Sequence, residues 1–170
     1  MFQDEARFGL IRSLKPCWAP AGMRPELNHR LARQYTYAYG AVSPLDGKSD
    51  FLILPSMRTE AFAYFLKELG RRYENEHIAL FVDGASSHRT DRLVVPENIT
   101  LITLPPYSPQ LNPIENLWKV MRERFFPNLD FESMERLEEN LADTLLYLEE
   151  TPELIRSVTG YQWLLDVIRI

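Results

Sequence analysis

Two short apolar runs in the middle of the chain limit the possible folds more than any other feature of the sequence. The first covers residues 78–82 and ends at Asp83-Gly84, and the second covers residues 99–104 and stops at Pro105-Pro106. Apolar runs of this length between turn residues are typical of strands that are buried on both faces of a sheet. Because ligands gather at the carboxyl ends of parallel strands, Asp83 marks a candidate site.

The residues before the first run predict three antiparallel strands and a helix. Residues 2–11 mix apolar and polar residues as a strand does, and residues 35–42 and 51–54 form a predicted hairpin around the turn 44–47. Thr59 is the expected cap of a helix. The apolar positions of this helix follow the helical period at Phe62, Phe65, Leu66, Leu69 and Tyr73. Strands joined through a helix imply right-handed crossovers, so the predicted fold is α/β with a mixed sheet.

Three helices are predicted after the second apolar run. Asn112 caps the first, with Pro113 at its first position, and Ser133 caps the second. A last helix begins at Thr151-Pro152 and ends near Gly160. The inward positions of the first two are Ile114, Leu117, Trp118, Met121 and Phe125, then Met134, Leu137, Leu141, Leu145 and Leu148. These helices are expected to flank the sheet.

Composition narrows the class of protein further. The chain has 170 residues, of which 45% are hydrophobic and 25% charged, which indicates one globular domain rather than a disordered chain. A single cysteine, Cys17, excludes an internal disulfide and a thiolate zinc cluster. The sequence has no apolar run long enough to span a membrane and no signal-peptide pattern. We therefore expect no membrane partner and a cytoplasmic location.

Charge is distributed unevenly along the chain. The formal net charge is −5, which is not typical of a protein that binds nucleic acid over its whole surface. Residues 130–153 contain nine acidic residues and one basic residue, whereas residues 7–33 contain six basic residues opposed only by Glu26. The basic stretch is either a solvated loop or a surface that faces a polyanion. Any contact with DNA must therefore be local.

Three carboxylates occupy positions that are well placed yet open to solvent. Asp4 lies in the first predicted strand, Asp83 ends an apolar strand, and Glu115 lies in the first turn of a helix. Mg²⁺ prefers oxygen ligands and takes a few carboxylates together with water and substrate phosphates. Two such ions activate an attacking oxygen and stabilise a leaving oxygen in phosphoryl transfer.

Each of these carboxylates also has an ordinary structural explanation. Asp4 follows the chain start closely, as solvated surface groups do, and Asp83 before Gly84 suits a turn. Glu115 follows Asn112 by three residues, as the glutamate of a capping box does. Taken one at a time, these positions do not distinguish a site from a surface.

Four sequence strings carry a resemblance to a known family. They are Phe2–Leu10 (FQDEARFGL), Trp18–Gly22 (WAPAG), Leu80–His88 (LFVDGASSH) and Leu104–Trp118 (LPPYSPQLNPIENLW). In order and spacing they resemble the DDE endonuclease domain of bacterial insertion-sequence transposases of the mariner superfamily. The last string is the most specific of the four, and the match extends over nearly the whole chain.

The resemblance implies a fold, a site and an activity. The fold would be ribonuclease H-like, with a mixed five-stranded sheet flanked by helices and extra C-terminal helices. Asp4, Asp83 and Glu115 would be the catalytic and metal-binding residues. The cofactor would be Mg²⁺ or Mn²⁺, as two ions. The activity would be DNA strand cleavage and strand transfer in transposition.

Four further residues are candidates for supporting roles. His88 is expected either to contact a phosphate near Asp83 or to be a surface hydrogen-bonding residue. Lys119 and Arg122 follow Glu115 by one and two turns and are expected to bind the DNA backbone, with surface solubility as the alternative. Asn112 is expected to be a cap first and a residue that orients the site second.

The chain departs from the family pattern at two places. Gly84 stands where relatives often have asparagine, and only three residues precede Asp4, so we expect the helix-turn-helix segment of the family to be missing. We expect a single DDE endonuclease domain over residues 1–170, with a catalytic core in 1–129 and a helical extension in 130–170. An upstream helix-turn-helix chain and a second copy of this chain are the expected protein partners, and the nucleoid is the expected location when the protein is on DNA.

Two other functions remain open at this stage. The chain is either an active transposase domain or an inactive remnant or partner-binding half of a split transposase. A ribonuclease H-like nuclease that acts on RNA–DNA hybrid shares the same carboxylate chemistry.

Overall fold

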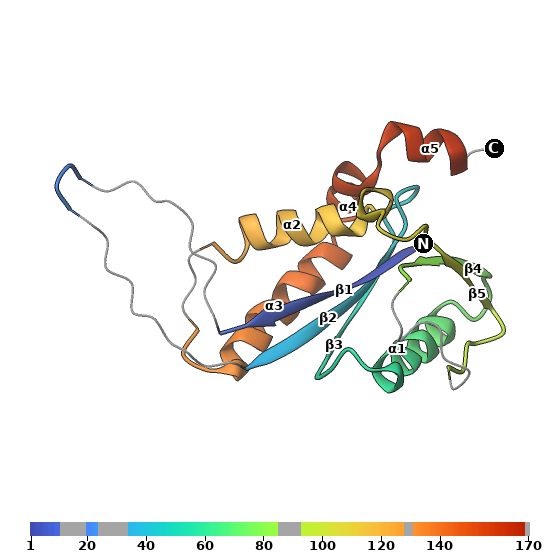
Figure 1. Cartoon of the computed structure of the whole chain (residues 1–170), viewed down its shortest axis with the longest axis horizontal. Helices are drawn as coiled ribbons and strands as arrows, with labels where there is room; N and C mark the ends of the chain where they lie inside the picture. The colour runs from blue at the N-terminus through green and yellow to red at the C-terminus, as the bar shows by residue number, and fades with distance from the viewer. Residues whose placement is uncertain (11–19, 24–33, 85–92, 128–130, 169–170) are drawn as a thin grey trace.

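The computed structural model describes residues 1–10, 20–23, 34–84, 93–127 and 131–168, and within them five strands form one mixed sheet (Figure 1). The strands are β1 (Phe2–Gly9), β2 (Tyr35–Val42), β3 (Ser49–Leu54), β4 (Ile78–Val82) and β5 (Ile99–Thr103). Their order across the sheet is β3-β2-β1-β4-β5. The first three are antiparallel, and β1, β4 and β5 run parallel. The predicted mixed sheet is confirmed.

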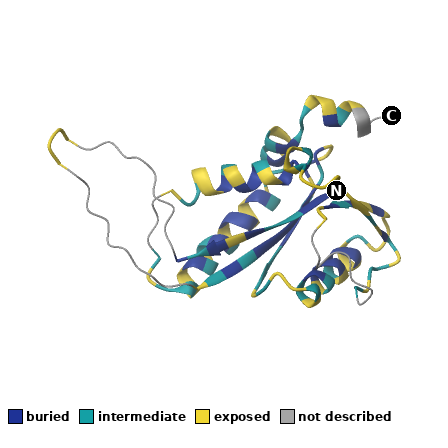
Figure 2. Cartoon of the chain, viewed as in Figure 1, coloured by how far each residue is buried: buried dark blue, intermediate teal, exposed yellow. Residues whose placement is uncertain are grey.

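Helices cover both faces of this sheet. The helices are α1 (Thr59–Arg72), α2 (Ile114–Arg124), α3 (Met134–Glu149), α4 (Pro152–Thr159) and α5 (Gln162–Ile168). Helix α1 packs on one face, and α2 and α3 pack on the other (Figure 1). Because side chains alternate along a strand, Ala38 and Val42 of β2 join the core under α2, whereas Tyr39 and Ala41 join the core under α1. The buried stripes of α1, α2 and α3 face these two cores (Figure 2).

Several predicted details of the strands and helices are wrong. Strands β4 and β5 are not buried on both faces: Ala79 and Ile102 are exposed, because β5 is the edge strand and β4 is its neighbour. Thr59 is the first residue of α1 rather than its cap, which is Arg58. The helix that ends at Gly160 is not the last, because α5 follows it. Ser133 does cap α3, since its Oγ accepts a hydrogen bond from the Arg136 N–H at 3.4 Å.

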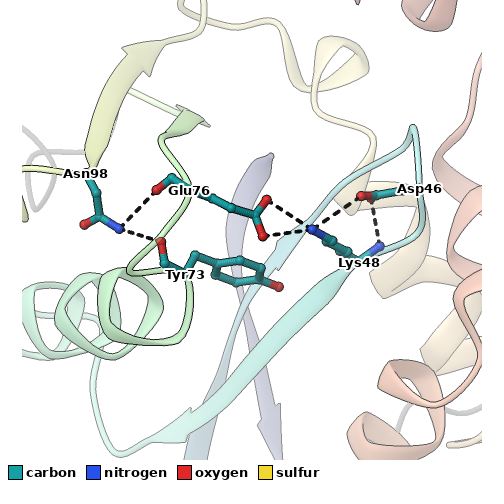
Figure 3. A network of polar contacts seen from close by, with 5 residues as sticks. All are labelled: Asp46, Lys48, Tyr73, Glu76 and Asn98. Atoms are coloured by element: carbon teal, nitrogen blue, oxygen red, sulfur yellow. Dashed lines mark hydrogen bonds and ion pairs between the residues drawn. The ribbon is translucent and has the colours of Figure 1, made fainter.

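A polar network fixes the position at which β4 begins (Figure 3). The Asn98 side-chain amide donates to the carbonyl oxygens of Gly70 at 3.0 Å and Tyr73 at 2.9 Å, which closes the C-terminal end of α1. The Lys48 ammonium donates to both carboxylate oxygens of Glu76, at 3.0 and 3.1 Å. The turn after β2, the end of α1 and the start of β5 are thereby joined around β4, whose other end carries Asp83.

A hollow of about 420 Å³ lies beside this network, between the turn after β2 and the start of β4. The charged side chains of the network pair with one another across it, so it offers no cluster of like charges for a ligand (Figure 3). The Met1 ammonium donates to the Ala79 carbonyl oxygen at 2.7 Å at its border. In the described part of the chain, no helix has the length and apolar character needed to cross a bilayer.

Candidate active site

The parallel neighbours β1 and β4 bring Asp4 and Asp83 close together. Phe2 of β1 pairs with Phe81 of the parallel strand β4, and their rings stack at 4.7 Å between centroids. Asp4 follows Phe2 by two residues on β1, and Asp83 follows Phe81 by two residues, directly after the end of β4. Because side chains repeat every two residues, both aspartates point to the face that carries the stacked rings. Strand β4 ends at Val82, so Asp83 lies just beyond its carboxyl end.

The third carboxylate reaches the same place from the other layer. Asp4, Asp83 and Glu115 line one pocket of about 420 Å³, together with Asn112 and residues 104–109. Glu115 lies in the first turn of α2, which packs over β1. Asp83 and Glu115 are exposed, whereas Asp4 is half-buried. The structure thus brings together the three carboxylates that the sequence singled out.

Asp4 lies in the least favourable position for a negative charge. Its neighbours on the same face of β1, Phe2, Ala6 and Phe8, belong to the apolar core under α2. Burial, followed by the negative charges of Glu115, Glu5 and Asp83, raises the pKa of Asp4 to about 8. A carboxyl group with this pKa is largely protonated at neutral pH unless positive charge enters the site.

Asn112 joins the two elements that carry Asp4 and Glu115. It is buried, and its side-chain amide donates to the main-chain oxygen of Gln3 at 2.9 Å. The prediction that Asn112 caps the helix is wrong: α2 has no side-chain cap, and Pro113 occupies the cap position. The expected orienting role remains a prediction, and the contact with β1 agrees with it.

The predicted DNA-contacting residues have different outcomes. Lys119 is exposed and lines a shallow hollow with Asn112 and Glu115, next to the carboxylate pocket. Arg122 is exposed and places its guanidinium over the Phe8 ring, at 5.4 Å from the centroid, so it lies along α2 away from the pocket. His88 lies outside the described residues.

Two residues at the site were not selected by the sequence reasoning. Trp118 was assigned only to the apolar stripe, yet its indole N–H donates to Asp4 Oδ2 at 3.1 Å. A buried tryptophan usually needs a partner for this N–H, which is the signal that was available. Tyr107 is fully exposed at the rim of the pocket and has a left-handed backbone, with φ of 56°. Nothing in its surrounding sequence indicated that conformation.

The fold and the placement of the carboxylates define a class. A mixed sheet of order β3-β2-β1-β4-β5, with acidic residues on β1, after β4 and on α2, is the arrangement of a ribonuclease H-like nuclease. Solved structures agree with this fold. The Mos1 transposase paired-end complex with left transposon end has a TM-score of 0.62 and 19% identity, covering 94% of this chain and 55% of that chain.

Two further Mos1 structures give the same result. The mariner Mos1 paired-end complex with Mn has a TM-score of 0.64 and 17% identity, covering 94% of this chain and 55% of that one. The Mos1 transposase catalytic domain with raltegravir and Mn has a TM-score of 0.54 and 16% identity, covering 94% and 82%. The chain therefore spans about half the length of the first two Mos1 chains, and at these low identities the TM-scores show a shared fold alone.

Sequence comparison identifies the family. The model of the DDE superfamily endonucleases matches residues 1–138. The uncharacterized protein y4pE/y4sA of Sinorhizobium fredii is 38% identical over 130 residues, which are 76% of this chain and 96% of that protein. The chain belongs to the DDE superfamily endonucleases, and the resemblance drawn from the four sequence strings is confirmed.

The site residues are chemically suited to a hard divalent cation. The pocket presents carboxylates from three elements, and their mutual repulsion contributes to the raised pKa of Asp4. Within the described ranges, no three His, Cys, Asp or Glu side chains are grouped closely enough to hold a metal ion by themselves. Mg²⁺ commonly takes only one or two carboxylates and completes its shell with water and phosphate oxygens. The donor set therefore fits such an ion when substrate supplies the remaining ligands.

Proposed function

We propose that this chain is a transposase catalytic domain that cleaves DNA and transfers strands, with Asp4, Asp83 and Glu115 as its catalytic, metal-binding residues. The observation that carries the proposal is the convergence of these three side chains on one pocket from β1, the end of β4 and α2. Membership in the endonuclease family supports it, and so does the fold shared with Mos1 in complexes with transposon ends and with Mn.

The three carboxylates would together bind Mg²⁺ or Mn²⁺. The chemistry that two such bound ions supply is activation of an attacking oxygen and stabilisation of the leaving oxygen in an in-line displacement at phosphorus. Asp4 lies on the central strand β1, near enough to Asp83 and Glu115 for their charges to raise its pKa. Asp83 and Glu115 are exposed, so each is accessible to a phosphate that enters from solvent. Asp4 is more buried than the other two carboxylates, and its Oδ2 accepts a hydrogen bond from Trp118, so its side chain is the most restrained of the three.

Lys119, next to this pocket, and Arg122, farther along α2, would bind the DNA backbone. Both are exposed on α2, about one and two turns after Glu115. Phosphate contacts of this kind fix the register of the nucleic acid without reading its sequence. His88 remains a candidate for the same role. An upstream helix-turn-helix chain would supply sequence recognition, a second copy of this chain is a further proposed partner, and the protein would act at the nucleoid.

The experiment is a nicking assay on supercoiled DNA with Mn²⁺. Asp83→Ala and Glu115→Ala are each expected to reduce nicking by about 100-fold or more, as the loss of a group that stabilises the transition state does. Asp143→Ala and Glu60→Ala are matched controls, because both remove exposed acids, and Glu60, like Glu115, lies in the first turn of a helix. Equal nicking by wild type and the two site variants would refute the assignment.

Two further arms separate the alternative functions. Replacing DNA with an RNA–DNA hybrid tests whether the same carboxylates serve a ribonuclease, which predicts faster cleavage of the hybrid. Calorimetric titration of the folded chain with Mn²⁺ tests for an inactive interaction domain, which predicts no binding.

A further inference from the structure

The Trp118 side chain lies over β1, β2 and β3, at the level of Asp4 on β1. Asp4 of β1 pairs with Gly40 of β2, and Gly40 pairs with Phe51 of β3, so these residues form one row across the sheet. The Trp118 ring rests on this row and is 1% exposed. Its centroid is 5.9 Å from that of Phe51, with the rings inclined at 60°. The indole is therefore held by packing along its whole length.

Gly40 makes this arrangement possible. A Cβ atom at this position would stand 2.8 Å from Trp118 Cη2 and 2.9 Å from Phe51 Cδ1, closer than such atoms approach one another. The backbone of Gly40 is not in the left-handed region, so the requirement here is for space rather than for conformation. The residue opposite Asp4 thus lets the indole approach the sheet.

The polar end of the indole meets the carboxylate of Asp4. Trp118 Nε1 donates to Asp4 Oδ2 at 3.1 Å, and an indole nitrogen can only donate. The indole N–H therefore contacts Oδ2 of the Asp4 carboxylate and not Oδ1. Because the ring cannot move, the plane of the carboxylate is restrained as well.

A second contact completes the alignment of α2 on β1. Asn112 donates to the Gln3 main-chain oxygen at 2.9 Å, next to the Trp118 contact with Asp4. Asn112 precedes the cap residue Pro113, and Glu115 and Trp118 are three residues apart in the first turns of α2. Asn112 and Trp118 thereby bond to consecutive residues of β1, which fixes the start of α2, the segment that carries Glu115, on this strand.

We infer that Trp118 is a positioning residue of the active site: its indole N–H orients the Asp4 carboxylate for metal, and the row Asp4–Gly40–Phe51 holds the indole. The inference rests on the proposed function, because it concerns the metal-binding role of Asp4. Hydrogen bonds to metal-ligating carboxylates typically contribute about 10- to 100-fold to metal affinity or activity. Loss of the Trp118 N–H is therefore expected to weaken metal binding by about this factor.

The test is calorimetric titration with MnCl₂ of wild type, Asp4→Asn, Trp118→Phe and Trp163→Phe. Trp118→Phe keeps an aromatic ring and removes the donor, and we expect it to weaken Mn²⁺ binding about 10- to 100-fold. Trp163 is 46% exposed, so Trp163→Phe is a matched control with an expected wild-type affinity. Gly40→Ala retains the indole but displaces it, and should weaken Mn²⁺ binding as well. It also serves as the test if Trp118→Phe does not fold.

A metal-free readout tests the hydrogen bond directly. In a ¹H–¹⁵N spectrum, the Trp118 indole resonance is the one that Trp118→Phe removes. It should shift in Asp4→Asn and stay in place in Asp83→Asn. Wild-type Mn²⁺ affinity in folded Trp118→Phe, with Asp4→Asn impaired, would overturn the inference and leave the proposed function intact. Absence of Mn²⁺ binding in wild type, both alone and with duplex DNA present to supply phosphate oxygens, would instead overturn the proposed function, together with the role in metal binding inferred here.

Discussion

At the scale of single residues, Asp4 shows how a site for cations lowers the stability of the protein that contains it. Burial and the charges of Glu115, Glu5 and Asp83 raise the pKa of Asp4 to about 8. The folded chain therefore holds this proton more tightly than the unfolded chain, in which an aspartate titrates near pH 4. The stability associated with the protonated carboxyl is complete below about pH 4 and is lost as the pH rises toward about 8.

This linkage gives a prediction for the metal-free protein. Its melting temperature should fall between about pH 4 and pH 8, and Asp4→Asn should flatten that fall and raise the melting temperature at pH 8. Thermal unfolding in EDTA over this range measures both, with the exposed Asp143→Asn as control. The same pH slope in wild type and Asp4→Asn would show that Asp4 titrates normally.

Gln3 is a second residue whose buried polar group lowers the stability of the folded chain. It is fully buried, and neither its side-chain oxygen nor its nitrogen has a hydrogen-bond partner among the described residues. An unpaired buried amide costs about 1–3 kcal/mol. Gln3→Met keeps the size and the main-chain oxygen that Asn112 uses, and should raise the free energy of unfolding by about 1 kcal/mol. Urea denaturation measures it, and exposed Gln110→Met should change nothing; a less stable Gln3→Met would indicate an internal partner for the amide.

At the scale of elements, periodicity predicted where most helices and strands lie but not which polar atoms meet. The stripe through Leu117, Trp118 and Met121 predicted the buried face of α2, and that face is buried. The partner of the Trp118 N–H lies on β1, and no local pattern relates the two segments. The same limit applies to Asn112, whose amide bonds to β1 rather than to its own helix. The exposed side of β5 was missed because an apolar run does not reveal which strand ends a sheet.

Helix α3 shows that an acidic residue can have a structural partner that its sequence does not suggest. The Glu149 Oε1 accepts the main-chain N–H of Phe51 on edge strand β3 at 3.1 Å. The same atom lies 3.6 Å from Arg72 of α1, whose guanidinium is 3.0 Å from buried Asp50. Glu149 therefore joins α3, β3 and α1, and it covers one donor on an edge that would otherwise be free to pair.

Removing this contact should loosen the edge of the sheet. Glu149→Ala is expected to lower the free energy of unfolding by about 1–2 kcal/mol, because a buried donor loses its acceptor. Arg72 is 53% exposed, so its ion pair with Glu149 adds little. Exposed Glu150→Ala is the matched control in the same urea titration and should stay within about 0.5 kcal/mol of wild type. Equal stability of the two variants would mean that water accepts the hydrogen bond of the Phe51 N–H as effectively as Glu149 does.

For the molecule as a whole, an acidic chain is expected to bind DNA only through a local surface. The net charge is −5, and residues 130–153 carry much of the negative charge. Part of that stretch is structural, since Glu149 holds the sheet edge and Arg136 pairs with Glu139 at 2.8 Å. Among the described residues, Lys119 and Arg122 are exposed basic residues of α2, and Lys119 lines a hollow next to the carboxylate pocket. The face around the pocket can therefore attract a polyanion while the C-terminal helices repel it.

The salt dependence of DNA binding tests this separation of charge. Each phosphate contact contributes about 0.9 to the slope of log K against log salt concentration. Lys119→Gln and Arg122→Gln should each weaken binding of duplex DNA similarly for all sequences and reduce the slope by about 1. Fluorescence anisotropy at several salt concentrations measures the slope. Arg136→Gln removes an equally exposed charge from α3 and should leave it unchanged, because the pairing with Glu139 and the surrounding acids keep DNA away. If Arg136→Gln reduced the slope as much as Lys119→Gln does, DNA would be binding without preference for the face that carries the carboxylates.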